Sequence, residues 1–182
     1  PAFIAADFLS QAEHGVDSQA MLVTASESIV EPVMQAIREQ LDRLPRKEIT
    51  EKSLSHSRLI VLKDKQEVID FTNLYAPEHL IIQTTDYADI AGQVENAGSV
   101  FMGPYTPESA GDYASGTNHT LPTNGYAKAY SGVNLDSFIK KITFQEITAD
   151  GIRLLGGTIR TMAANEQLDA HKNAVTIRLN TL

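Results

Sequence analysis

The chain has 182 residues, 42% of them hydrophobic, and a formal net charge of -8 at pH 7. This length and composition predict one globular domain, or one domain with a small appendage, and exclude a disordered chain. The acidic balance, with no basic run longer than Arg46–Lys47 or Lys140–Lys141, argues against nucleic acid and anionic membranes as partners. Cysteine is absent, so a metal would need nitrogen and oxygen ligands.

The first residues, PAFIAADFLSQ, lack the basic segment followed by an apolar segment that is typical of a signal peptide. No apolar run is long enough to cross a bilayer. We therefore expect no membrane partner and a cytoplasmic location. The chain begins at Pro1 without Met, which suggests a piece of a longer polypeptide.

Predicted helices and short apolar strands alternate over the first part of the chain. Apolar spacing predicts helices over 1–14, from Ser26 or Ser28 to about Leu44, and over 47–56, 65–74 and 87–94. Short apolar runs predict strands over 20–24, 58–62, 80–83 and 99–102. This alternation is typical of α/β proteins with a mostly parallel sheet flanked by helices. We expect residues 1–133 to form such an incomplete, Rossmann-like domain.

The pattern changes toward the C-terminus. Residues 141–147 alternate as a single strand does, residues 148–165 have one apolar stripe of a helix, and a further helix is predicted from Asp169. These elements are too few for an independent core. Residues 134–182 are therefore expected to form a small α-rich C-terminal domain that packs on the main domain or on another subunit.

The stretch from Glu108 to Thr123, ESAGDYASGTNHTLPT, is polar, rich in small residues and almost free of aliphatic side chains. A loop of this composition usually exists for what it binds. It follows the fourth predicted strand, and Glu78 and His79 precede the third. Ligands of parallel sheets gather at the strand ends, so this is where we expect a site.

A metal site is one chemistry that the residues allow. Gln11 and His14 share a face of the first predicted helix, Asp112 lies in the polar loop and His171 lies in the tail. Two imidazoles, a carboxylate and an amide oxygen suit zinc or a similar divalent ion. An isolated histidine is more often a surface residue than a metal ligand. Sequence spacing alone also does not show that residues so far apart meet, so the alternative that these are unrelated surface residues stays open.

Acid–base work by Glu78 and His79 is a second possibility. If this pair opens a strand, the two side chains point to opposite sides, although an exposed turn after Pro77 explains the pair equally simply. The segments GDYASG and LLGG lack the lysine or the glycine spacing of phosphate-binding loops. No GxSxG elbow and no nucleophile with an evident base are present.

Five motifs outweigh these general arguments. In order along the chain, SQAEHG, NLYAPEHL, AGSVFMG, PESAGDYASGTNHTLPT and AHKNAV resemble the signatures of the histidinol dehydrogenase family. The resemblance covers essentially the whole chain and corresponds to the C-terminal portion of the family's longer polypeptide. It implies a zinc enzyme that ends histidine biosynthesis, oxidising L-histidinol through the aldehyde to L-histidine while two NAD are reduced in turn.

The resemblance also implies roles for individual residues, most of them in the main domain. The implied catalytic pair is Glu78, which activates water to hydrate the aldehyde, and His79, which takes the proton in each oxidation. The implied zinc ligands are Gln11, His14, Asp112 and His171. The implied substrate contacts are these four ligands together with His79, Tyr113, His119 and Glu166.

By the same resemblance, the NAD-contacting residues and one substrate-contacting serine belong to an N-terminal half that is absent from this sequence. We therefore expect the chain alone not to turn over histidinol. The family implies a domain-swapped homodimer, in which Glu166 and His171 act across the subunit boundary. Two alternatives remain: a binding or regulatory module that kept the fold without activity, and a zinc hydrolase that uses Glu78 and a bound water.

Overall fold

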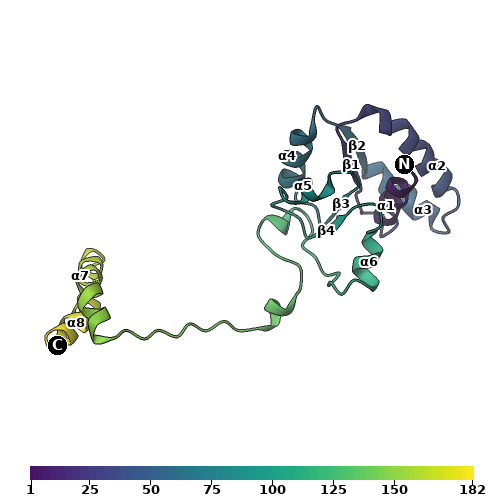
Figure 1. Ribbon diagram of the computed structural model, residues 1–182. Helices are drawn as coiled ribbons and strands as arrows, with labels where there is room; N and C mark the ends of the chain where they lie inside the picture. Colours follow the sequence, from purple (N-terminus) through teal and green to yellow (C-terminus); the bar gives the residue numbers. More distant parts are fainter. The chain divides into compact units, whose positions relative to one another are not determined.

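The computed structural model describes residues 1–182, which divide into two compact units, Pro1–Ile139 and Lys140–Leu182 (Figure 1). The predicted boundary after residue 133 falls a few residues earlier. No helix in the structure combines the length and the apolar character needed to cross a membrane.

The first unit alternates helices and short strands, and the predicted α/β class is confirmed. Its main elements, in order, are α1 (Ala2–Ala12), β1 (Met21–Thr24), α2 (Val30–Leu41), α3 (Lys47–His56), β2 (Arg58–Val61), α4 (Lys65–Tyr75), β3 (His79–Ile82), α5 (Tyr87–Ala91), β4 (Ser99–Met102) and α6 (Glu108–Tyr113). A short 3₁₀ turn, Glu27–Ile29, leads into α2, and two more, Tyr126–Lys128 and Leu135–Phe138, follow α6.

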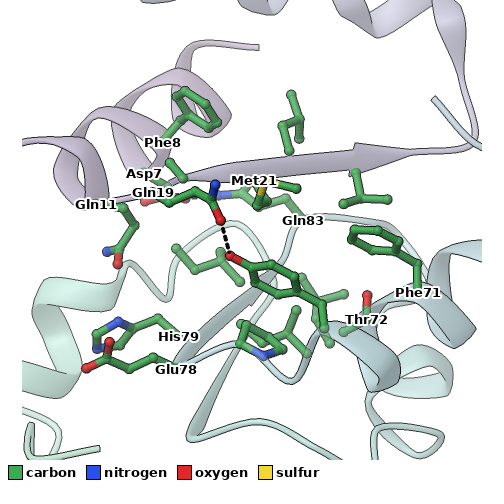
Figure 2. Close-up of a pocket in the computed structure, with 18 of the residues that line it drawn as sticks. Asp7, Phe8, Gln11, Gln19, Met21, Phe71, Thr72, Glu78, His79 and Gln83 are labelled. Atoms are coloured by element: carbon green, nitrogen blue, oxygen red, sulfur yellow. Dashed lines mark hydrogen bonds between the residues drawn. The ribbon is translucent and has the colours of Figure 1, made fainter. Parts of the chain in front are cut away.

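The single predicted sheet is wrong. β1 pairs in parallel with β2 and β3 pairs in parallel with β4, which gives two separate two-stranded sheets. Residues of β1 and β3 line the same cleft, so side chains and open space lie between the sheets instead of a hydrogen-bonded ladder. The Tyr75 hydroxyl crosses this space to donate to the Gln19 side-chain oxygen at 2.7 Å (Figure 2).

The core of the unit fixes the helix that leads to the cleft. Ala5 and Leu9 of α1 pack with Val33 and Ile37 of α2, and all four are buried. The small Ala5 side chain allows α1 to approach α2 closely. This packing anchors α1 so that its last turn, which holds Gln11, has a defined place.

The start of β3 depends on a close backbone approach. Ala76 ends α4 with a φ of 56°, which turns the chain into Pro77 and Glu78. Gly98 N–H then donates to Pro77 O at 2.9 Å, and a Cβ at residue 98 would lie 2.5 Å from Glu78 O. Only glycine lets the chain entering β4 lie this close to Glu78.

The helix α6 occupies the start of the stretch that we expected to be a loop. Its glycine, serine and aspartate disfavour a helix in isolation, so tertiary packing must offset this preference. The contact is made by Gly111, which is buried and sits against the ring of Phe101 in β4. As a consequence, Glu108 and Asp112 lie one helical turn apart on one face of α6.

Substituting Gly111→Ala should destabilise the first unit. The added Cβ would lie 2.7 Å from Phe101 Cε1, and this ring is only 5% exposed and has little room to shift. We expect a loss of about 1–3 kcal/mol from overpacking, of which up to ~1 kcal/mol is recovered through helix propensity. Thermal unfolding measures it, with Gly92→Ala, where the Cβ meets ordinary contacts of 3.5 Å or more, as control. Equal melting temperatures for the two variants would contradict the expectation.

The second unit is a helical hairpin. The helices α7 (Ala149–Asn165) and α8 (Asp169–Leu179) confirm the two predicted helices, and Gly156 of α7 faces Leu179 of α8. The strand predicted over 141–147 is wrong, because these residues pair with no strand. Alternating residues need a neighbouring strand to form a ladder. Ile142 and Phe144 are instead 71% and 91% exposed.

Candidate metal and acid–base site

A cleft of about 1740 Å³ lies within the first unit. It is lined from α1, β1, α4, β3, α6 and the segment after α6. Six residues singled out from the sequence line it: Gln11, His14, Glu78, His79, Asp112 and His119. Side chains from segments far apart in the sequence therefore meet in one place.

The end of α1 places Gln11 and His14. The two were expected on one helical face, but α1 ends at Ala12, so only Gln11 is helical. His14 lies in the turn beyond the C-cap residue Glu13, and its N–H faces Gln11 O at 3.5 Å. The turn still keeps both side chains on the cleft, and the His14 side chain is half exposed there.

Glu78 and His79 do not both open a strand, so the opposite orientation expected in that case does not apply. Both line the cleft, and Figure 2 shows their side chains beside each other near Gln11. The reason is that β3 begins at His79, so Glu78 still belongs to the turn after Pro77 and the alternation of a strand does not apply to it. The two groups can therefore act on one bound molecule.

Glu108 is the site residue that the sequence argument missed. Its side chain is 3% exposed, with Oε1 3.6 Å from His79 Nε2 and Oε2 4.0 Å from His14 Nε2. Oε1 has no hydrogen-bond partner. Potential ligand atoms of His79, Glu108 and Asp112 all lie within 4.8 Å of one another. The spacing of Glu108 and Asp112, four residues apart, would have indicated this cluster had the helix been expected.

Burial controls the proton affinities in this cluster. It raises the pKa of Glu108, which a hydrogen bond with Asp112 raises further. Burial also raises the pKa of Glu78, opposed by the nearby His14. For His79, burial lowers the pKa, and the negative charge of Asp112 only partly offsets this. The site thus favours a neutral imidazole beside carboxyl groups of increased basicity.

The donors in the cleft fit a divalent cation. Imidazole nitrogens, carboxylate oxygens and the Gln11 amide oxygen are the ligand types that zinc accepts when no thiolate is available. A buried carboxylate oxygen without a hydrogen-bond partner, Glu108 Oε1, points the same way, because such an atom is stabilised by positive charge. Positive charge at this point would also relieve the contact between the Glu108 and Asp112 carboxyl groups.

The lowered pKa of His79 gives a pH prediction for the metal-free chain. We expect its ring to titrate below the ordinary value of 6.5, because burial disfavours the imidazolium ion. Between the folded pKa and pH 6.5, the unfolded chain binds more protons than the folded chain does. The contribution of His79 to stability is therefore complete above pH 6.5 and is lost as the pH falls through the folded pKa. Ring NMR titration measures this, with a His79→Asn variant to assign the signal. A midpoint at or above 6.5 would contradict the expectation.

One predicted site residue of the first unit is not part of this cluster, and two others belong to the second unit. Tyr113 is 85% exposed and does not line the cleft. Glu166, at the C-terminal end of α7, and His171, in the first turn of α8, belong to the second unit and are exposed there. His119 is exposed but lines the cleft.

The fold and the cleft define an α/β protein with an imidazole–carboxylate site suited to a divalent cation and to proton transfer. The family model for histidinol dehydrogenase matches residues 1–179. The chain therefore belongs to the histidinol dehydrogenase family.

Individual relatives are similar over the full chain. Histidinol dehydrogenase of Bacteroides thetaiotaomicron is 67% identical over 182 residues, which are 100% of this chain and 42% of that protein. The chloroplastic histidinol dehydrogenase of Arabidopsis thaliana is 56% identical over 183 residues, covering 100% of this chain and 39% of that protein. The crystal structure of histidinol dehydrogenase from Elizabethkingia anophelis superposes with a TM-score of 0.94 at 55% identity, covering 100% of this chain and 42% of that one. The chain thus spans less than half the length of these relatives.

Proposed function

We propose that the chain forms part of an enzyme that oxidises L-histidinol to L-histidine through the aldehyde, a four-electron oxidation linked to NAD. The observation that carries this proposal is the meeting of Glu78 and His79 with the cation-binding donors of one cleft. Two oxidations and one hydration step require a group that accepts protons and a group that activates water, and the adjacent pair supplies both.

His79 is proposed as the base of both oxidations. Its lowered pKa keeps the imidazole neutral at neutral pH, which is the form that accepts a proton from the alcohol, and later from the aldehyde hydrate, as hydride leaves. Its side chain is 11% exposed, so little water competes for the proton. The Asp112 charge favours the imidazolium once it has formed.

Glu78 is proposed to activate the water that hydrates the aldehyde. Burial raises its pKa, and a carboxylate of raised pKa is a stronger base toward water than an exposed one. Because it lies beside His79 on the cleft, it can deliver this water to the carbon from which hydride is removed.

Zinc is proposed to be held by Gln11, His14 and Asp112, with His171 as the fourth ligand. When bound, zinc would orient the substrate through the imidazole and amine groups of the substrate. Contacts of the substrate with Tyr113, His119 and Glu166 are proposed on the resemblance alone. The chain has no glycine-rich dinucleotide loop, so no step is assigned to a residue that binds NAD.

We further propose a homodimer in which His171 and Glu166 complete the site of the neighbouring subunit. Co-folding equal amounts of Asp112→Ala and His171→Ala chains then tests the shared site. Random pairing in a two-fold symmetric dimer should restore roughly a quarter of the wild-type zinc sites. Sites built within one chain would restore none. For the location of the protein we keep the cytoplasm as the proposal, which cell fractionation would check.

The activity is tested by NADH formation from L-histidinol. The chain by itself should not sustain turnover, since it spans 42% of the length of the Bacteroides thetaiotaomicron relative. A chimera in which the chain replaces the matching residues of the Bacteroides thetaiotaomicron relative should turn over. A chimera that binds zinc and histidinol but forms no NADH would favour the alternative, a binding module that kept the fold.

A further inference from the structure

We propose that Glu108 is a positioning residue of the metal site: its buried carboxylate holds Gln11 and His14 in the orientation in which they bind the cation, and joins them to His79. This inference rests on the proposed metal site. Its geometric basis is that the two carboxylate oxygens face different imidazoles, Oε1 toward His79 Nε2 at 3.6 Å and Oε2 toward His14 Nε2 at 4.0 Å.

The position of Glu108 places it behind the groups that face the cleft. Gln11, His14, His79 and Asp112 all line the cleft, whereas Glu108 does not. It is also 3% exposed, while the His14 side chain is 50% exposed. A cation that enters from the cleft therefore meets the other donors first, and Glu108 supports them from the protein side.

A place in the first turn of α6 favours a carboxylate at residue 108, but it does not require that the carboxylate be buried. Glu108 follows Pro107, the N-cap of α6, and the cap makes no side-chain hydrogen bond. Oε1 has no hydrogen-bond partner at all. Burying a carboxylate is costly unless it is paired, so an apolar residue would serve the fold better. The benefit must come from what the carboxylate does for its neighbours.

The Gln11 amide shows how this support works. A side-chain interaction with the Gln11 amide lowers the pKa of Glu108 and so favours its charged form, and only the NH₂ end of an amide can do this. With the nitrogen committed in this way, the amide oxygen is the atom left for a cation. A glutamine whose amide is not held can rotate and present nitrogen, which does not bind zinc. Outer partners of this kind are known to fix the orientation of metal ligands.

The test uses Co²⁺ as a spectroscopic probe and Zn²⁺ in competition with a chelator, on the full chain. Glu108→Gln keeps the shape and removes the charge, so we expect metal affinity to fall by roughly 10- to 100-fold with the Co²⁺ absorption bands unchanged in position. Glu39→Gln, on the exposed side of α2, removes the same charge away from the cleft and should bind as the wild type does.

A double-mutant cycle with Gln11→Ala separates positioning from general stability. If Glu108 acts through Gln11, the loss caused by Glu108→Gln should be smaller in the Gln11→Ala background than in the wild type. Additive losses, or an unchanged affinity, would overturn the inference. Shifted Co²⁺ bands would also overturn it, because Glu108 would then be a ligand itself.

Two further results of this test have different consequences. If the wild-type chain binds neither metal, the proposed metal site fails, and the role of Glu108 that rests on it falls as well. If Glu108→Gln does not fold, Glu108→Asp keeps the charge on a side chain one methylene shorter. We then expect a melting temperature near that of the wild type and a metal affinity at least several-fold weaker, and wild-type affinity in this variant would overturn the inference.

Discussion

Replacing His79 by Asn should lower kcat for histidinol oxidation by roughly 100- to 10,000-fold in the active chimera, the range by which a general base accelerates such steps. Asn cannot accept the proton that His79 is proposed to take in both oxidations. KM should change much less than kcat, because the metal-binding donors Gln11, His14 and Asp112 are untouched and only the contact of His79 with the substrate is lost. NADH formation under steady-state conditions measures both constants.

The matched control is His56→Asn. His56 ends α3, is exposed, and is absent from the residues that line the cleft, although its backbone oxygen accepts from Gln19 at 2.8 Å. Its substitution leaves this backbone bond in place and should leave turnover unchanged. Retention of activity within a few-fold by His79→Asn would remove the base from the proposed mechanism.

The second large effect is expected for Asp112→Asn. Asp112 is proposed as the anionic ligand of zinc, and its substitution replaces a charged donor by a neutral amide. Loss of an outer partner already weakens metal sites by about 10- to 100-fold, so loss of a ligand should exceed this. Calorimetric titration of the metal-free chain with Zn²⁺ measures the change.

An exposed aspartate provides the comparison. Asp70 in α4 only accepts a hydrogen bond from Gln66 at 2.9 Å, and Asp70→Asn should bind zinc as the wild type does. An Asp112→Asn chain with unchanged zinc affinity would place the cation elsewhere.

Much of the first unit could be predicted because its elements carry regular patterns. All four strands and the helices α1 to α5 begin and end close to where apolar periodicity put them. The division into two sheets could not be predicted, because strand patterns report burial and length but not which strands pair. Likewise, the alternation over 141–147 predicted a strand, but the second unit contains no other strand with which these residues could pair.

The site was predicted less well, for a specific reason. The composition of the Glu108–Thr123 stretch favours a loop, and the contact of Gly111 with Phe101 that forms α6 is a tertiary effect. Without that helix, nothing in the sequence set Glu108 apart from the other polar residues near it. Gln11, Glu78, His79 and Asp112 were identified from the motifs, and the cleft brings these four together.

The contact between Glu108 and Asp112 should make the stability of the folded state depend on a bound cation. Two carboxyl groups held together at low exposure weaken the folded state whenever no cation is present. A metal that binds only the folded chain adds about 2.7 kcal/mol of stability at one hundred times its Kd. Zinc supply would then set the lifetime of the protein against proteases, so that starvation for the metal reduces abundance as well as catalytic capacity.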